Sequence, residues 1–115
     1  REAAFAAWVA RYAPDGDWDF SPDSLDALEQ VVRREAPSVA ELTDPARRDL
    51  LAGASWYLGE VLRRGLGGQW ERDRDYEYVR QVGPYRGKMI PALVLEDALT
   101  NPGQLRRHYD RFAGR

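Results

Sequence analysis

The 115-residue sequence contains no cysteine and a single histidine, His108. Without cysteine the chain has no disulfide, no thiol nucleophile and no thiolate metal ligand. A lone histidine also rules out a two-histidine metal site within one chain. Lys88 is the only lysine among 17 basic residues. The residue types that most often build catalytic and metal sites are therefore scarce, and we expect no cofactor.

The sequence also lacks a long apolar run and a strong excess of either charge. No stretch is long enough to span a bilayer, so we expect no membrane partner. The formal net charge of −2 argues against nucleic-acid binding, which needs a concentrated basic face. With 43% hydrophobic and 31% charged residues, residues 1–115 are predicted to form one ordinary cytoplasmic domain.

Two further absences concern the origin of the chain. The sequence begins at Arg1 and its only methionine is Met89, so we expect the natural start to lie upstream. Arginine replaces lysine almost everywhere and alanine is abundant, which is typical of a GC-rich bacterial genome.

The strongest pattern is an amphipathic helix between Asp44 and Trp70. Asp44 followed by Pro45 is a typical helix start, because the carboxylate caps the first turn and proline needs no amide partner there. At about 100° per residue, one stripe is apolar: Leu50, Leu51, Ala54, Tyr57, Leu58, Val61 and Leu62. The opposite side carries Asp49, Trp56, Glu60, Arg63 and Arg64, and the helix is expected to stop at Gly65, Gly67 and Gly68.

The remaining elements are predicted around this central helix. Helices are expected over residues 2–13, 22–35, 92–99 and 104–112, with one capped turn at residues 38–41. Three short antiparallel strands are expected over residues 69–72, 76–82 and 88–90. The predicted fold is therefore α+β: amino-terminal helices, a small antiparallel sheet and two short carboxyl-terminal helices around one central helix.

The run Tyr57–Trp70, YLGEVLRRGLGGQW, carries a resemblance. With the following IPALVLEDAL segment and a final helix containing Leu105 and Tyr109, it is similar to small bacterial α+β domains of unknown function. These share a helix end of the type YLGEVhRRxhGGxW, where h is apolar. The similarity covers residues 50–112. It implies a fold and carries no catalytic residues.

One segment has metal-like spacing: Asp15, Asp17, Asp19 and Asp26 match carboxylate positions of a calcium-binding EF-hand loop. However, Phe20 occupies the position where that loop requires glycine. A second interpretation explains the segment better, in which Ser21 caps the next helix and Pro22 takes its first position. Residues 14–32 contain six acids and no basic residue, and we expect a solvated surface or a site for a basic partner.

No catalytic set emerges from the remaining polar residues. His108 is expected at the surface or half-buried on the last helix rather than as a general base. The serines at 21, 24 and 38 lie in capping contexts, and Ser55 lies inside the central helix without a nucleophile-elbow sequence. The glycines after residue 64 follow a helix, whereas phosphate-binding glycines precede one.

Aromatic and charged residues at polar positions are the candidate binding residues. They are Trp56, Glu60, Arg63, Trp70, Tyr76, Tyr78 and Tyr85. Tyrosine, tryptophan and arginine are favoured at contact hot spots. For Trp56 the alternative is that a neighbouring helix covers it and makes it part of the core.

Two classes of function follow from these residues. The first hypothesis is a noncatalytic protein-interaction domain of an accessory or immunity-like type in bacteria, which binds another protein through its aromatic and acidic surface. The alternative is a small-molecule or metal-ion binding domain, with carboxylate-based hydrolytic activity. It predicts a pocket between residues 65–70 and the strands, where Glu60, Arg63, Asp73 and Tyr78 converge. A third possibility is a homo-oligomer.

Overall fold

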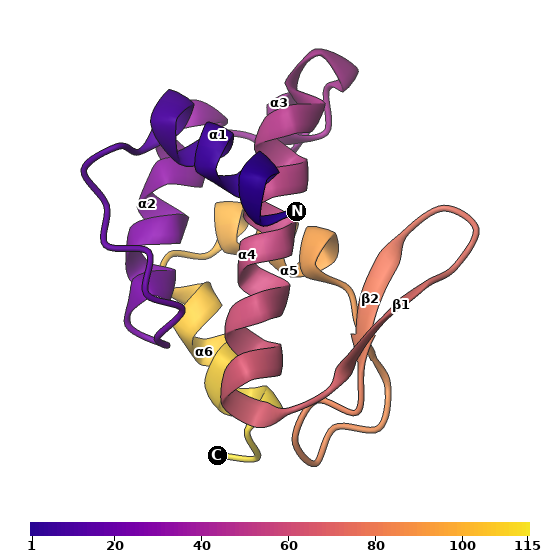
Figure 1. The fold of residues 1–115 in the computed structure, drawn as a ribbon. Helices are drawn as coiled ribbons and strands as arrows, with labels where there is room; N and C mark the ends of the chain where they lie inside the picture. The colour runs from indigo at the N-terminus through magenta and orange to yellow at the C-terminus, as the bar shows by residue number, and fades with distance from the viewer.

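The computed structural model describes residues 1–115 and confirms the predicted α+β fold (Figure 1). The elements, in chain order, are α1 (Glu2–Tyr12), α2 (Ser24–Glu35), α3 (Val39–Leu42), the 3₁₀ turn η1 (Pro45–Arg47), α4 (Arg48–Leu66), β1 (Gln69–Arg72), β2 (Glu77–Arg80), β3 (Lys88–Met89), α5 (Pro91–Thr100) and α6 (Gln104–Phe112). The strands form one antiparallel sheet in the order β1-β2-β3.

Helix α4 runs through the middle of the molecule and contacts α1, α2 and α5 (Figure 1). The β1–β2 hairpin projects to one side of it. Of the predicted apolar stripe, every residue except the half-buried Leu51 is buried. Twenty-six buried apolar residues from all parts of the chain form one contiguous cluster around this stripe. The prediction that α4 forms the centre of the core is therefore confirmed.

The predicted caps position the elements before α4. The Asp44 carboxylate accepts a hydrogen bond from the Ala46 amide at 3.0 Å, and Pro45 follows it. This first turn is a 3₁₀ turn, so α4 begins only at Arg48. Upstream, the Ser38 hydroxyl accepts a bond from the Glu41 amide, as a capping serine does.

The start of α2 is shifted from its predicted position. The Ser21 hydroxyl accepts a bond from the Ser24 amide, but residues 22 and 23 form a turn and the helix begins at Ser24. The Ser24 side chain then shares a 2.7 Å hydrogen bond with the buried Tyr57 hydroxyl, which also accepts from the Phe20 amide. Local capping and a tertiary contact to α4 therefore fix the same turn.

Three glycines inside α4 each contact an aromatic side chain from a different element. Gly53 lies against Trp8 of α1, Gly59 against Trp70 of β1 and Gly65 against Tyr109 of α6. A Cβ atom at any of the three would overlap the aromatic side chain. The glycines are six residues apart, so at about 100° per residue they face three directions roughly 120° apart.

This arrangement corrects the prediction for Gly65, which was expected to end the helix. Gly65 is helical, and its lack of a side chain makes room for the Tyr109 hydroxyl. The helix ends at Gly67 and Gly68, whose φ angles of +87° and +125° lie in the region that favours glycine. The chain then enters β1, where Trp70 pairs with Val79 in the register of the hairpin.

Glu29 on α2, predicted to face solvent, instead caps α6. Its carboxylate accepts hydrogen bonds from the amides of Gly103 at 2.7 Å and Leu105 at 3.1 Å. A carboxylate at this place satisfies free amides of the first turn and complements the helix dipole. The carboxyl-terminal helix is thus attached to α2 by a contact that sequence spacing does not reveal.

We predict that Gly59→Ala destabilises the protein by about 1–3 kcal/mol, because its methyl group overlaps the packed ring of Trp70. Helix propensity alone predicts the opposite, a gain of about 1 kcal/mol. The free energy of unfolding, measured by urea denaturation, decides between the two.

The control for this prediction is the same substitution in a Trp70→Ala background. Once the ring is removed, Gly59→Ala is expected to be neutral or stabilising. An equal loss in both backgrounds would show that the cost does not come from the contact with Trp70.

Candidate functional site

A cleft of about 720 Å³ lies between α1, the first turns of α4 and the β1–β2 hairpin. Residues 42–45 and the start of α5 complete its lining. Three of the predicted binding residues, Trp56, Trp70 and Tyr76, line this cleft. They come from three different segments of the chain, so the fold brings together residues that the sequence only suggested separately.

Small side chains give the cleft its width. Ala4 and Ala7 of α1 and Ala52 of α4 line it, Gly53 makes room for the Trp8 ring, and Ala92 adds a further small residue from α5. The residues between these small side chains are aromatic or aliphatic. The result is an apolar surface that is open on one side, with its charged residues at the rim.

Trp56 is 9% exposed, so of the two interpretations of this residue the covered one is confirmed. Helix α1 and the segment before α2 cover that side of α4, and the ring packs against Phe5 and Phe20 at centroid distances of 5.5 and 5.9 Å. The indole N–H groups of Trp8, Trp18 and Trp70 donate hydrogen bonds, whereas that of Trp56 has no partner within the chain.

Ser55 adds a second polar group without a partner. Its hydroxyl is buried, lines the cleft and makes no hydrogen bond. Buried polar groups are normally paired. The adjacent Ser55 and Trp56 therefore offer hydrogen-bonding groups that the protein itself leaves unused.

Glu60 holds the hairpin wall of the cleft in place. Its carboxylate accepts a 2.7 Å hydrogen bond from the Trp70 indole N–H and further bonds from Arg63 at 2.7 and 3.0 Å and Arg64 at 3.1 Å. Glu60 is 5% exposed. The Arg63 guanidinium, with help from Trp70 and Arg64, lowers the pKa of Glu60 to about 2. This carboxylate is therefore ionised and fully used within the fold.

The Glu60 contacts correct two predictions. Glu60 and Arg63 were expected on an open face as binding residues, but they bind one another and Trp70. The pocket in which they would converge with Asp73 and Tyr78 is not formed. Asp73 contacts Lys88 and Tyr76, and Tyr78 donates to Glu71 on the hairpin.

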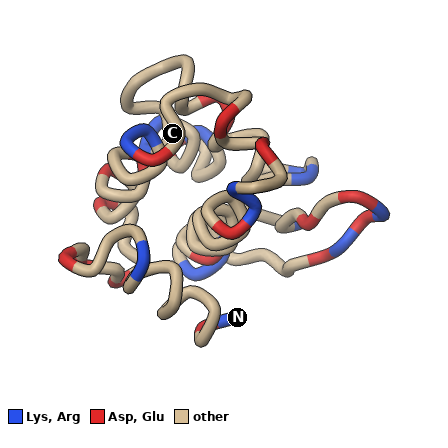
Figure 2. Tube along the Cα trace, turned by 90° about the horizontal axis from the view of Figure 1, so that it is seen from above, with Lys and Arg blue, Asp and Glu red and all other residues tan.

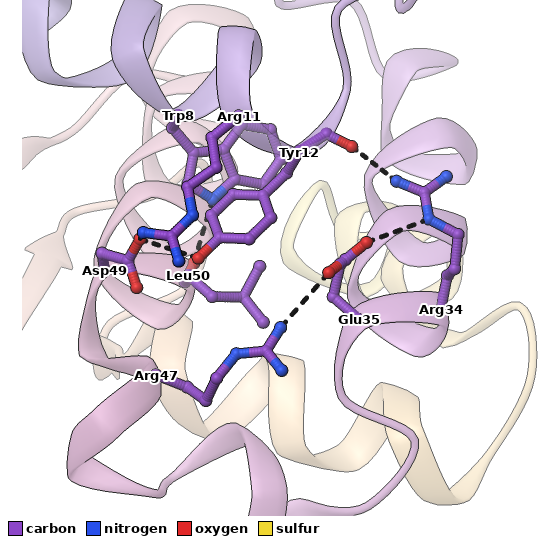
Figure 3. Close-up of polar contacts among 8 residues, drawn as sticks. All are labelled: Trp8, Arg11, Tyr12, Arg34, Glu35, Arg47, Asp49 and Leu50. Carbon is purple, nitrogen blue, oxygen red and sulfur yellow. Dashed lines mark hydrogen bonds and ion pairs between the residues drawn. The ribbon is translucent and has the colours of Figure 1, made fainter.

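A polar network fixes the α1 wall (Figure 3). Asp49 accepts 2.7 Å hydrogen bonds from Arg11 and from the Tyr12 hydroxyl, and Trp8 donates to the Leu50 carbonyl at 3.1 Å. The bond from Tyr12 and the charge of Arg11 hold the pKa of Asp49 below its usual value. Through this network the carboxyl-terminal half of α1 is tied to the start of α4.

Charges at the rim of the cleft are largely paired. Arg11 pairs with Asp49, and Arg1 pairs with Glu77 while its guanidinium lies 5.4 Å from the Trp70 ring centroid. Acidic and basic residues alternate around the tip of the hairpin, over residues 71–75 (Figure 2). The rim therefore presents neither sign of charge in excess.

Two predicted binding residues, Tyr78 and Tyr85, are not among the residues that line the cleft. Tyr78 belongs to a group on the sheet in which the Lys88 ammonium lies 4.8 Å from its ring centroid. Hydrogen bonds to Tyr76 and Asp73 raise the pKa of Lys88, so this lysine stays protonated. Tyr85 is 41% exposed and packs edge-on against Phe112 of α6.

His108 is buried, contrary to the prediction of a surface or half-buried position. Its Nε2 lies 2.7 Å from an Asp97 carboxylate oxygen, and the Arg111 guanidinium contacts its Nδ1. Because an arginine can only donate, Nδ1 is the acceptor and Nε2 carries the proton. Both ring nitrogens are thus occupied by contacts between α5 and α6.

The calcium-loop interpretation of Asp15, Asp17, Asp19 and Asp26, which the sequence already made the less favoured one, is not supported by the structure. No group of three acidic or histidine side chains is placed to hold a metal ion. Asp19 accepts a hydrogen bond from the Ser21 amide at 3.0 Å, and Asp26 lies 3.7 Å from the Arg106 guanidinium. The carboxylates are therefore directed to local turns and to α6 rather than to one centre.

Comparison with known proteins gives no relative from which a function can be transferred: no family model, no curated protein and no solved structure matches the chain. The resemblance carried by residues 57–70 stays a prediction. In the structure, no helix combines the length and the apolar character needed to cross a membrane.

The alanines that shape the cleft were missed by the sequence reasoning. Ala3, Ala4, Ala6, Ala7 and Ala10 of α1 are all exposed. A signal was present, because only Phe5, Trp8 and Tyr12 of this helix are large and buried. A helix that buries one narrow aromatic stripe and exposes alanine on both sides leaves room beside it.

We predict that Glu60→Gln destabilises the folded protein by about 2–3 kcal/mol at pH 7, because the pKa of Glu60 falls from 4.5 to about 2 on folding. Because the pKa of Glu60 is lower in the folded state, the ionised carboxylate stabilises the fold. This stabilisation is fully present above pH 4.5 and is lost as the pH falls toward 2. The difference between the two proteins in urea denaturation should therefore shrink over that interval.

Glu41→Gln is the matched control, since Glu41 is exposed and forms no ion pair. Its stability should track that of the wild type at every pH. A Glu60→Gln difference that stayed constant from pH 7 to pH 2.5 would contradict the assigned charge network.

Proposed function

We propose that this protein is a noncatalytic interaction domain whose cleft receives an apolar segment of another protein. The observation that carries the proposal is the convergence of Trp56, Trp70 and Tyr76 on one open apolar cleft. Tryptophan and tyrosine supply most of the binding energy at many protein interfaces. The bacterial accessory or immunity-like role is part of the same proposal.

The shape and the charges of the cleft favour a polypeptide segment. Small ligands are usually enclosed over most of their surface, whereas this cleft is open along one side. Four of the seven charged residues that line it form ion pairs with one another, so the apolar lining provides much of the selectivity.

The state of the polar residues supports a noncatalytic role. Glu60 is ionised and fully bonded, and Lys88 is held protonated. His108 has both ring nitrogens occupied between Asp97 and Arg111. A general base or nucleophile needs an available lone pair beside the bound substrate, and these three groups do not offer one there.

A second candidate function is the binding of a small apolar molecule in the same cleft. The volume of about 720 Å³ falls within the range of small-molecule sites. This candidate predicts that small apolar compounds raise the melting temperature of the wild type, and that filling the cleft abolishes the effect.

We predict that Ala7→Arg, which fills the cleft from its α1 wall, weakens the binding of cleft-directed peptides at least tenfold. The probes are peptides selected from a random phage-displayed library against the wild-type protein, and affinity is measured by fluorescence polarisation. Arginine is a good helix former, so the exposed position should tolerate it.

Ala10→Arg is the matched control, because Ala10 is an exposed alanine of the same helix that does not line the cleft. It should bind the same peptides as tightly as the wild type. Selected peptides that bind Ala7→Arg and the wild type equally would refute the cleft as the interaction site.

A further inference from the structure

We propose a second binding surface on the other flank of α1, an aromatic groove with an acidic border that receives a basic amphipathic segment of a partner protein. The groove measures about 460 Å³. It is lined by Glu2, Phe5, Ala6, Val9, Trp18, Phe20 and Trp56. The groove shares Phe5 and Trp56 with the cleft, but its partner approaches from the other flank of α1, so either surface can be occupied alone.

The geometry of α1 separates the two surfaces. At about 100° per residue, Ala7 and Ala6 point to opposite flanks of the buried stripe formed by Phe5, Trp8 and Tyr12. Ala7 accordingly lines the cleft and Ala6 lines the groove, while Ala10 faces outward between them.

The groove already accommodates a cation from the protein itself. The Arg64 guanidinium lies 3.6 Å from the centroid of the Phe20 ring and 3.6 Å from a Glu2 carboxylate oxygen. A guanidinium placed over an aromatic face and beside a carboxylate is a favourable arrangement for arginine. The Phe20 ring is already occupied, with Arg64 on it and Tyr57 stacked at 4.8 Å, whereas the half-buried Trp18 ring holds no cation and offers the same chemistry to a cationic side chain of a partner.

Glu2 is the one acid that lines the groove, and three more acids without an ion pair lie beside its residue Trp18 in the sequence. Asp15, Asp17 and Asp19 surround Trp18 in sequence, are exposed and form no ion pair. The charges of Asp19 and Asp17 add to the effect of burial in raising the pKa of Tyr57, whose ring packs against both Phe20 and Trp18. Asp17 and Asp19 therefore lie near enough to this aromatic cluster to act on it electrostatically.

The other acids of residues 14–32 form ion pairs, so the lack of pairing is confined to Asp15, Asp17 and Asp19. Asp23 and Asp26 pair with Arg106, and Glu29 pairs with Arg33. Residues 14–32 contribute no basic residue of their own. Three carboxylates without an ion pair, beside half-buried aromatic rings, complement a segment that carries both apolar and basic side chains, and they disfavour nucleic acids and anionic surfaces.

The test uses two synthetic amphipathic peptides of equal length, one of leucine and arginine and one of leucine and glutamate, titrated into the ¹⁵N-labelled protein. We expect the leucine–arginine peptide to bind, to shift the Trp18 indole N–H resonance and to weaken as salt is raised. The leucine–glutamate peptide should bind at least tenfold more weakly.

Variants locate the binding without disturbing the core. Ala6→Arg adds bulk and a positive charge inside the groove and should reduce affinity for the basic peptide at least tenfold. The Asp17→Asn, Asp19→Asn double variant should reduce it about threefold to tenfold at low salt. Ala10→Arg adds the same charge on the outer face of α1 and should have little effect.

Ala7→Arg separates this proposal from the proposed function. It should leave the basic peptide bound, just as Ala6→Arg should leave the cleft-selected peptides bound. Equal affinity of the two synthetic peptides, or unchanged binding of the basic peptide by Ala6→Arg, would overturn the groove proposal whatever the outcome for the cleft.

Discussion

The contact between the Trp70 indole and the Gly59–Glu60 pair is the interaction on which the arrangement of the two halves depends. The ring lies on Gly59, and its N–H donates to the Glu60 carboxylate at 2.7 Å. Because Glu60 also accepts from Arg63 and Arg64, one buried charge joins the end of α4 to the first strand. Burial of a charge is unfavourable unless hydrogen bonds satisfy it, and here four do.

This contact gives a physical meaning to the run Tyr57–Trp70. Tyr57 and Leu58 are core residues, Gly59 provides space for a ring, Glu60 binds its N–H, and the two arginines neutralise Glu60. Gly67 and Gly68 turn the chain so that Trp70 can return to the helix. These residues make different contacts but depend on one another, since the contacts of Gly59 and Glu60 with Trp70 form only when the Trp70 ring lies on the helix.

The glycines of α4 lower the helix propensity of the segment but allow close tertiary packing. Each glycine inside a helix costs about 1 kcal/mol relative to alanine. In exchange, Gly53, Gly59 and Gly65 let aromatic side chains of three elements approach the helix axis closely, on three sides. Aromatic side chains bury large areas, so close approach offsets the lost propensity. A six-residue spacing distributes the contacts around the helix instead of placing them on one face.

The elements and the core could be predicted from sequence because their signals are local. Capping at Ser38 and Asp44, the stripe of α4 and the period of the strands depend on neighbours along the chain. The environment of Glu60 could not be predicted, since its position on a helical wheel is polar and only the return of Trp70 buries it. For Trp56 the sequence left a covered and an exposed position open, and only the place of α1, distant in sequence, decides between them.

The candidate site was predicted only in part for a related reason. Three of the aromatic residues singled out at polar positions, Trp56, Trp70 and Tyr76, line the cleft, but small side chains shape its walls as much as large ones do. Ala4, Ala7 and Ala52 carry no chemical signal, and their role appears only when α1 and α4 are placed side by side. A method that seeks reactive side chains will overlook such positions.

The structure also explains how α1 can be held firmly while two of its flanks stay open. Its attachment is concentrated in one stripe, where Phe5, Trp8 and Tyr12 are buried, and in the bonds of Trp8 and Tyr12 to α4. A helix fixed along one stripe needs no large side chains elsewhere, so alanine on both flanks is compatible with stability. Binding surfaces bordered by such a helix are preformed, and a partner then loses less free energy to ordering the protein.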